Sequence, residues 1–362
     1  MKRSVILVGI ILLPLVASVL TGCAKAEKFF ADEYLELAVR NYLGKSEYEA
    51  ITAEDLAEIT SLGNWTAYRL ITDLSGIEYC TSLTNLNLNN NQITDISPLS
   101  SLTNLTRLNL SSNYISDISS LASLTNLRYL DLYENQITDI SNLSSLDNLT
   151  DLSLYLNDVS DISPLTSLIN LEKLDLSMNQ ITDLSPLADL KNLTFLYLGG
   201  NHIGDLAPLS SLVNLFWLNL GDTHTSDISP LSTLNNLGAL FLTDNQISNI
   251  ASLAGSEKLG LLWLDDNLIS DITPLSSLIK LFSLRLSNNQ IKDISPLSGL
   301  IELDSLYLTG NLIEDISPLL ENDGLAGGDK IWLEDNNLDL SAGSEDILVI
   351  ETLGTRRVTI NY

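Results

Sequence analysis

The sequence predicts an α/β solenoid, an arc of stacked coils in which each coil adds one short strand to a parallel sheet on the concave side and one short 3₁₀ turn to the convex side. Three observations predict it. An asparagine recurs at a constant spacing, as in Asn91, Asn113 and Asn135, and continues to Asn311 with Thr223 in the one gap. Leucines lie five and three positions before each of these sites. Eight of the nine prolines lie seven positions after them.

The leucine pairs predict the strands. Two leucines separated by one residue, as in Leu108 and Leu110, show the alternation of a short strand with one buried face. A single coil cannot bury its own leucines, so stacked coils must share one core. The asparagine in the following turn can bond free backbone groups of neighbouring coils if it is buried. Because strands pack more closely than the turns opposite them, we expect the stack to curve into a horseshoe-shaped arc.

The prolines predict the turns. Each usually follows a serine, and Ser-Pro is a helix N-cap followed by a first-turn proline. A 22-residue coil leaves no room for a long helix, which favours a 3₁₀ turn. An aspartate precedes the turn in ten of eleven coils, with Asn249 as the exception, and we expect it to cap local backbone N–H groups. These aspartates are Asp95, Asp117, Asp139, Asp161, Asp183, Asp205, Asp227, Asp271, Asp293 and Asp315.

The segment 1–22 has the pattern of a secretory signal. Lys2 and Arg3 precede an apolar stretch that is too short for a comfortable membrane span. Leu20-Thr-Gly-Cys23 resembles the bacterial lipobox, in which the cysteine is lipidated and becomes the mature N-terminus. We therefore expect a lipoprotein signal peptide over 1–22 and a lipid-anchored tether over 23–28. With Cys23 used in this way, Cys80 is expected to be a free, buried apolar residue.

The Asp-Ile-Ser-Pro-Leu form of the coil resembles the internalin-type leucine-rich repeats of bacterial surface proteins, over residues 83 to about 340. The resemblance implies a right-handed superhelix with a helical N-terminal cap. Apolar positions at helical spacing over 29–62, such as Leu35 and Val39, agree with such a cap, which with a degenerate first coil would occupy 29–82. At the other end, a short helix (346–353) and a strand (356–362) would form a C-terminal cap over 341–362.

Composition limits the possible functions. The chain has 18 Lys and Arg against 46 Asp and Glu, a formal net charge of −28. A surface this acidic repels phosphate backbones, which excludes nucleic acid as a partner. Two cysteines and two histidines leave little for a zinc site or for histidine-dependent catalysis.

Aromatic residues mark the predicted ligand-binding face. If the leucines point inward, the residues six, four and two positions before each asparagine point outward on the concave side. Ten of the thirteen aromatic residues between 83 and 336 occupy those positions, and aligned exposed rings are typical of an interaction surface. Gly199 and Gly221 should leave open space beside them. The predicted ligand-binding residues are Tyr129, Tyr133, Tyr155, Phe195, Tyr197, Trp217, Phe241, Trp263, Tyr307 and Trp332.

Two smaller groups of residues are candidates for metal sites. His202 and His224 share a frame position on adjacent coils, one that other coils fill with an exposed polar residue, so we expect no metal there. Asp222, Asp244 and Asp266 form a column that could hold calcium loosely through carboxylate oxygens, or could simply face solvent. Loosely bound calcium is the one cofactor left open.

These observations favour a non-enzymatic, monomeric lipoprotein that faces the exterior or the periplasm and binds an extracellular protein or glycan on its concave face. Two alternatives remain. One is an intracellular scaffold, since phosphatase-regulating leucine-rich repeat proteins also use 22-residue coils, although the leader argues against it. The other is a surface glycan hydrolase that uses concave carboxylates such as Asp131, Asp151 and Asp175, although no nucleophile–base motif accompanies them.

Overall fold

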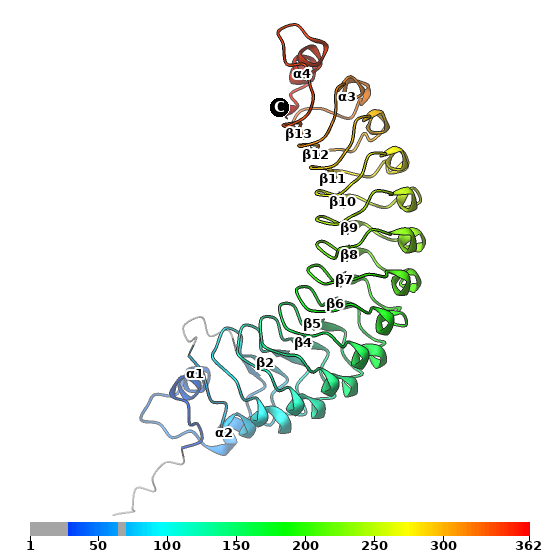
Figure 1. The fold of residues 1–362 in the computed structure, drawn as a ribbon. Helices are drawn as coiled ribbons and strands as arrows, with labels where there is room; N and C mark the ends of the chain where they lie inside the picture. The colour runs from blue at the N-terminus through cyan, green and yellow to red at the C-terminus, as the bar shows by residue number, and fades with distance from the viewer. Residues whose placement is uncertain (1–27, 64–69) are drawn as a thin grey trace, which may run out of the picture.

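The computed structural model describes residues 28–63 and 70–362, so the predicted leader and Cys23 lie outside the described residues. Within them, fourteen parallel strands form one sheet in chain order. Figure 1 shows an arc with the strands on its inner side and the short turns on its outer side, which confirms the predicted solenoid. The strands are β1 Ser61–Leu62, β2 Asn85–Asn87, β3 Arg107–Asn109, β4 Tyr129–Asp131, β5 Asp151–Ser153, β6 Lys173–Asp175, β7 Phe195–Tyr197, β8 Trp217–Asn219, β9 Ala239–Phe241, β10 Leu261–Trp263, β11 Ser283–Arg285, β12 Ser305–Tyr307, β13 Lys330–Trp332 and β14 Thr359–Asn361.

The leucine pairs lie inside the arc, as the alternation predicts. In β8, for example, Leu218 and the following Leu220 have no exposed surface. Leu218 pairs with Leu240 of the next strand, and the sheet keeps this offset of one coil length from β2 to β12. One continuous apolar core therefore follows the whole stack, and no coil has a separate core of its own.

The repeated asparagines join each coil to the previous one. The Asn179 side chain donates from Nδ2 to the carbonyls of Leu154 (2.9 Å) and Leu176 (3.0 Å). Its Oδ1 accepts the backbone N–H of Val159 at 3.0 Å, in the previous coil. The side chain is 9% exposed, so these bonds satisfy polar backbone groups that water does not reach.

Thr223 stands where the other coils have asparagine, and a threonine pair compensates for the change. Its Oγ1 lies 3.0 Å from Oγ1 of Thr225 and 2.9 Å from the carbonyl of Leu220, and both threonines are buried. The backbone N–H of Ile203, which would have bonded an asparagine oxygen, donates instead to the Thr223 carbonyl at 3.1 Å. The following His224 takes a positive φ of 60°. The irregular coil therefore keeps its buried hydrogen bonds in a different arrangement.

Short 3₁₀ turns form the convex side, as predicted, but the expected serine N-cap is wrong. Ser97 is the first residue of η2 and gives no side-chain cap, because the Asp95 carboxylate caps instead, accepting the Ser97 N–H at 2.8 Å. All ten predicted aspartates make this bond, and Asn249 makes it to Ala251. The turns are η1 Ile77–Tyr79, η2 Ser97–Ser101, η3 Ser119–Ser123, η4 Ser141–Ser145, η5 Ser163–Ser167, η6 Ser185–Leu187, η7 Ala207–Ser211, η8 Ser229–Thr233, η9 Ala251–Leu253, η10 Thr273–Ser277 and η11 Ser295–Leu297.

Two helices precede the repeats, α1 (Glu33–Leu43) and α2 (Ala53–Ala57). Asp32 caps α1 by accepting the N–H of Leu35 at 3.0 Å, and its second oxygen accepts the N–H of Thr72 at 2.8 Å. This one carboxylate therefore ties the helical cap to the first coil. The coil also contains Cys80, which is free and fully buried in the core.

The last coils lead into α3 (Pro318–Glu321), α4 (Glu345–Thr355) and β14. Asp346 of α4 is 5% exposed and accepts the backbone N–H of Asp339 at 2.9 Å. Arg356 donates to the carbonyl of Leu320 at 2.9 Å, which fixes the end of α4 against α3. In the described part of the chain, no helix has the length and apolar character needed to cross a membrane.

Candidate ligand-binding face

The ten predicted aromatic residues all lie on the strands or within two residues of their carboxyl ends, outside the leucine core. None of them belongs to the core cluster of buried residues. Nine are partly exposed, and only Phe241 is buried, at 8% exposure. The Phe241 ring centroid lies 4.7 Å from that of Trp217 and 4.8 Å from that of Trp263. Neighbouring rings on the concave face therefore cover Phe241, whereas its neighbours along the chain, Leu240 and Leu242, lie in the core.

These contacts extend into a continuous row of side chains, here called the aromatic ladder. Tyr197 and Trp217 have ring centroids 6.1 Å apart, and Tyr307 and Trp332 stack at 4.0 Å with an interplanar angle of 5°. Arg285 fills the gap between the two groups of rings. The ladder crosses β7 to β13 and consists of Tyr197, Trp217, Phe241, Trp263, Arg285, Tyr307 and Trp332.

The Arg285 guanidinium lies between two rings. Its Cζ atom is 4.7 Å from the centroid of Trp263 and 4.9 Å from that of Tyr307. Its Nε is 2.7 Å from Oδ2 of Asp265, whose side chain is 3% exposed and whose Oδ1 also accepts the Ser287 N–H. A cation over an aromatic face is attracted by the ring quadrupole, so Arg285 joins the two ring groups while Asp265 sets its orientation.

A second group of rings, the tyrosine group, consists of Tyr129, Tyr133 and Tyr155. Tyr133 and Tyr155 stack with centroids 4.9 Å apart and an angle of 7°. The Arg107 guanidinium lies 4.2 Å from the Tyr129 centroid. Burial raises the pKa of the Asp131 carboxyl beside this group, although a hydrogen bond from the Tyr133 N–H opposes the shift.

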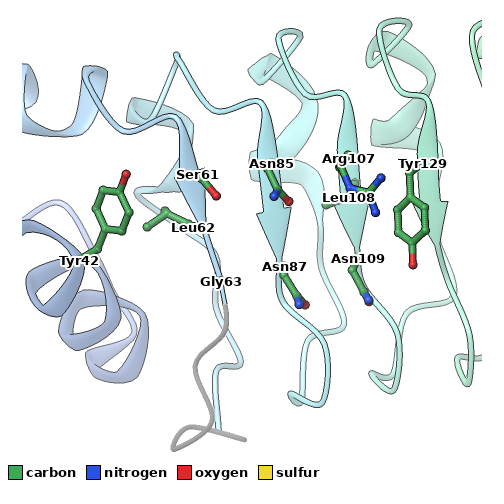
Figure 2. A pocket seen from close by; sticks show the side chains of 10 residues that line it. All are labelled: Tyr42, Ser61, Leu62, Gly63, Asn85, Asn87, Arg107, Leu108, Asn109 and Tyr129. Atoms are coloured by element: carbon green, nitrogen blue, oxygen red, sulfur yellow. The ribbon is translucent and has the colours of Figure 1, made fainter.

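Two open cavities lie on this face. One, of about 420 Å³, lies beside α1 and is lined by residues of β1, β2, β3 and β4 (Figure 2). Tyr42 of α1 and Tyr129 of β4 stand at opposite sides of it, with asparagine amides and Arg107 between them. The other, of about 370 Å³, lies at the carboxyl ends of β5 to β8. Its lining residues are Tyr155, Asp175, Ser177, Met178, Tyr197, Gly199, Gly200, Asn219, Gly221 and Asp222.

Sequence reasoning missed two rings at the edge of the face. Phe216 is 50% exposed and Phe282 is 44% exposed. Each lies over a glycine of the neighbouring coil, because a Cβ atom on Gly238 or Gly260 would meet the ring within 3 Å. Both phenylalanines occupy the frame position seven places before the conserved turn position, directly before the strand. That shared position was visible in the sequence and could have identified them.

The residues considered for metals are exposed in the turns. His202 and His224 stack with centroids 4.2 Å apart. The pKa of Asp244 is raised, first by burial and then by the neighbouring carboxylates of Asp266 and Asp222. Within residues 28–63 and 70–362, no group of three or more His, Cys, Asp or Glu side chains could hold a metal ion. Loose calcium binding at the aspartate column stays a prediction.

Comparisons with known proteins identify the family. A sequence profile described as "Leucine Rich repeats (2 copies)" matches residues 68–101, 81–123, 125–167, 169–211 and 279–321. The crystal structure of the internalin InlF from Listeria monocytogenes is 36% identical, with a TM-score of 0.85, over 92% of this chain and 96% of that chain. The internalin C2 from Listeria monocytogenes is 43% identical, with a TM-score of 0.57, over 59% of this chain and 95% of that chain.

A leucine-rich repeat protein of Leptospira interrogans shares the fold at 23% identity, with a TM-score of 0.72 over 81% of each chain. No curated protein sequence matches this chain. The family profile covers just over half of the chain, and the InlF match extends over nearly all of it. Together with the aspartate-capped 22-residue coils and the helical cap, these matches show that the chain belongs to the internalin-like leucine-rich repeat proteins.

Proposed function

We propose that this protein is a cell-surface binding module that captures an extracellular protein on the concave face of its solenoid. The aromatic ladder is the observation that carries the proposal. It extends over seven consecutive strands, outside the core, with each member in contact with the next. Large rings of this kind contribute most of the binding energy at protein interfaces.

The ladder is also rigid before any ligand arrives. The inner rings, such as Phe241, are held on two sides by their neighbours, and Arg285 is held by the buried Asp265. Ordering a side chain on binding costs about 0.5–1.5 kcal/mol, and a preformed surface avoids most of that cost. Membership of the internalin-like family supports the same function, because such repeats present a concave sheet as an interaction surface.

A glycan is the second candidate ligand, and the cavity beside α1 favours it. Tyr42 and Tyr129 offer ring faces, and Asn85, Asn87 and Asn109 offer amides, and none of the described residues of the lining has a carboxylate (Figure 2). Amide groups provide both donors and acceptors, which suits the hydroxyl groups of a neutral sugar.

The paired variant Trp217→Ala and Trp263→Ala tests the proposed face. The full-length chain, kept in detergent, would be applied to arrays of extracellular proteins and of glycans. Loss of two central rings is expected to weaken capture at least 30-fold, which corresponds to about 2 kcal/mol. Tyr114→Ala is the control, because Tyr114 is 53% exposed but lies in a turn, off the face. Equal capture by the paired variant and the control would refute the proposal.

We also propose that Cys23 carries the membrane anchor. Each buried lipid methylene contributes about 0.8 kcal/mol, so a multiply acylated cysteine would hold the protein firmly. Mass spectrometry of the membrane fraction should find an N-terminal, acylated Cys23, and Cys23→Ser should release the protein. An unmodified N-terminus at Met1 on protein from the cytosol would contradict the surface location.

A further inference from the structure

The cavity at the carboxyl ends of β5 to β8 exists because two coils lack a side chain there. Gly199 and Gly221 occupy the frame position two places before the conserved turn position, where Tyr133 and Tyr155 stand in earlier coils. At this frame position the residues therefore change from the two stacked tyrosines, through Ser177, to the glycines of two adjacent coils. The space that the missing side chains leave is the open cavity of about 370 Å³.

Aromatic walls border this cavity, and each is braced from outside it. Tyr155 lines it and stacks on Tyr133 at 4.9 Å. Tyr197 also lines it and contacts the Trp217 ring, with centroids 6.1 Å apart. Neither Tyr133 nor Trp217 is part of the lining. The two tyrosine rings are therefore positioned by neighbours, and a ligand does not have to order them.

Two carboxylates complete the lining, and neither forms an ion pair with a described residue. Asp175 is partly buried, and its Oδ1 accepts the Ser177 N–H at 3.0 Å. Among the described residues, no Lys, Arg or His nitrogen lies within 4 Å of Asp175 or Asp222. The nearby Lys173 ammonium instead lies 5.9 Å from the Tyr197 centroid. Burial raises the pKa of the Asp175 carboxyl, although the hydrogen bonds from Ser177 and the more distant charge of Lys173 oppose the shift. The ionised carboxylate would therefore gain from a cation in direct contact with it.

We infer that this cavity receives the cationic side chain, lysine or arginine, of a protein partner bound on the concave face. Ring faces attract a cation, and the alkyl part of the same side chain can lie along the rings. The net charge of −28 adds a long-range attraction for a basic segment. The inference rests on the proposed function and specifies the chemistry of the partner.

Two pentapeptides make suitable probes. Acetyl-Ala-Ala-Lys-Ala-Ala-amide carries the cation, and the same peptide with norleucine keeps the alkyl chain without the charge. Binding would be followed by NMR of the full-length chain in detergent, through the backbone signals of Tyr197 and Gly221. The lysine peptide is expected to bind with a Kd of about 1 mM, and the norleucine peptide at least 10-fold more weakly.

Three variants locate the site. Asp175→Asn removes the charge without changing shape, and Gly221→Ser narrows the cavity; each should weaken binding of the lysine peptide about 5- to 10-fold. Asp151→Asn is the matched control, because Asp151 lies on the concave face but outside the lining, and it should leave the affinity unchanged. The inference is wrong if the two peptides bind equally, or if Asp151→Asn weakens binding as much as Asp175→Asn.

The serine variant is compatible with the fold. A Cβ atom on Gly221 would lie 3.4 Å from Oδ1 of Asn219 and 3.5 Å from the Thr243 carbonyl oxygen, which are ordinary contacts. Ser111 and Ser177 already occupy the same frame position in other coils. The peptide test and the capture test can also fail separately: the Trp263→Ala variant keeps every lining residue, including Tyr197, so it should still bind the lysine peptide even if capture on the arrays fails.

Discussion

Replacing Asn179 by alanine should destabilise the solenoid by about 2–4 kcal/mol. In the described structure, the Val159 N–H has its one hydrogen bond with Asn179 Oδ1, at 3.0 Å, in a buried environment. An orphaned buried N–H costs about 1–3 kcal/mol, and the lost donor bonds add about 1 kcal/mol. That second amount is small because the Leu154 carbonyl keeps a bond from Asn157 at 3.1 Å, and the Leu176 carbonyl likewise keeps a bond from Asn201.

Urea unfolding followed by circular dichroism measures the change, with Asn148→Ala as the control. Asn148 also bonds a carbonyl of the previous coil, that of Thr125 at 2.9 Å, but the bond is exposed. Water replaces an exposed partner, so the control should lose less than about 1 kcal/mol. Equal losses for the two variants would show that burial of the asparagine does not govern its contribution, and would refute the reasoning.

Three further predictions follow from the structure. Burial, with a smaller contribution from Glu78, raises the pKa of the Cys80 thiol to about 12. At pH 8 about one Cys80 thiol in ten thousand is then ionised, so a thiol reagent should label Cys80 only in unfolded protein. Labelling of Cys80 in the native chain at the rate of free cysteine would contradict this prediction. The hydrogen bond from the Ser119 N–H lowers the pKa of the Asp117 carboxyl in the folded protein. The stability that this carboxylate contributes is therefore fully present above its pKa in the unfolded chain, near 3.9, and is lost as the pH falls through its lower pKa in the folded protein. The Asp117→Asn variant should therefore fold at pH 7, and its stability should fall less steeply than that of the unmodified protein as the pH is lowered. Urea unfolding midpoints from pH 5 to 2 measure this dependence. The same dependence on pH in both proteins would count against the capping role of Asp117. If calcium binds the aspartate column, calorimetry should detect it and Asp244→Asn should weaken it, whereas no heat at millimolar calcium would end that hypothesis.

Much of the fold could be predicted because one frame repeats. The alternating leucines specify which strand face is buried, and the 22-residue offset specifies the register, since a one-residue slip would turn leucines such as Leu218 toward solvent. The capping detail was missed for a local reason. Asp95 and Ser97 are both good capping residues, and only the backbone of the turn decides that the aspartate reaches the free N–H.

The candidate site was predictable as a set of positions but not as a set of contacts. The frame places Trp217, Phe241 and Trp263 on one face, and it also places Arg285 one coil after Trp263, so the cation in the ladder could have been found by extending the count. The buried pair with Asp265 could not, because it depends on side-chain conformation. The open space beside Gly199 and Gly221 was predicted from the missing side chains, and a cavity lies there. The rest of its lining, such as Met178 and Asp222, depends on how the turns of neighbouring coils are placed, which spacing alone does not report.

The unchanged pairing offset from β2 to β12 has a consequence for how this protein can diverge. Gene duplication or loss of a 22-residue unit between the caps leaves every remaining strand paired in the same way. The surface offered to a partner can then lengthen or shorten in increments of about 4.8 Å, while Asp32 and Asp346 continue to hold the two ends. Relatives with different numbers of coils would be expected to recognise partners of different length with the same repeated architecture.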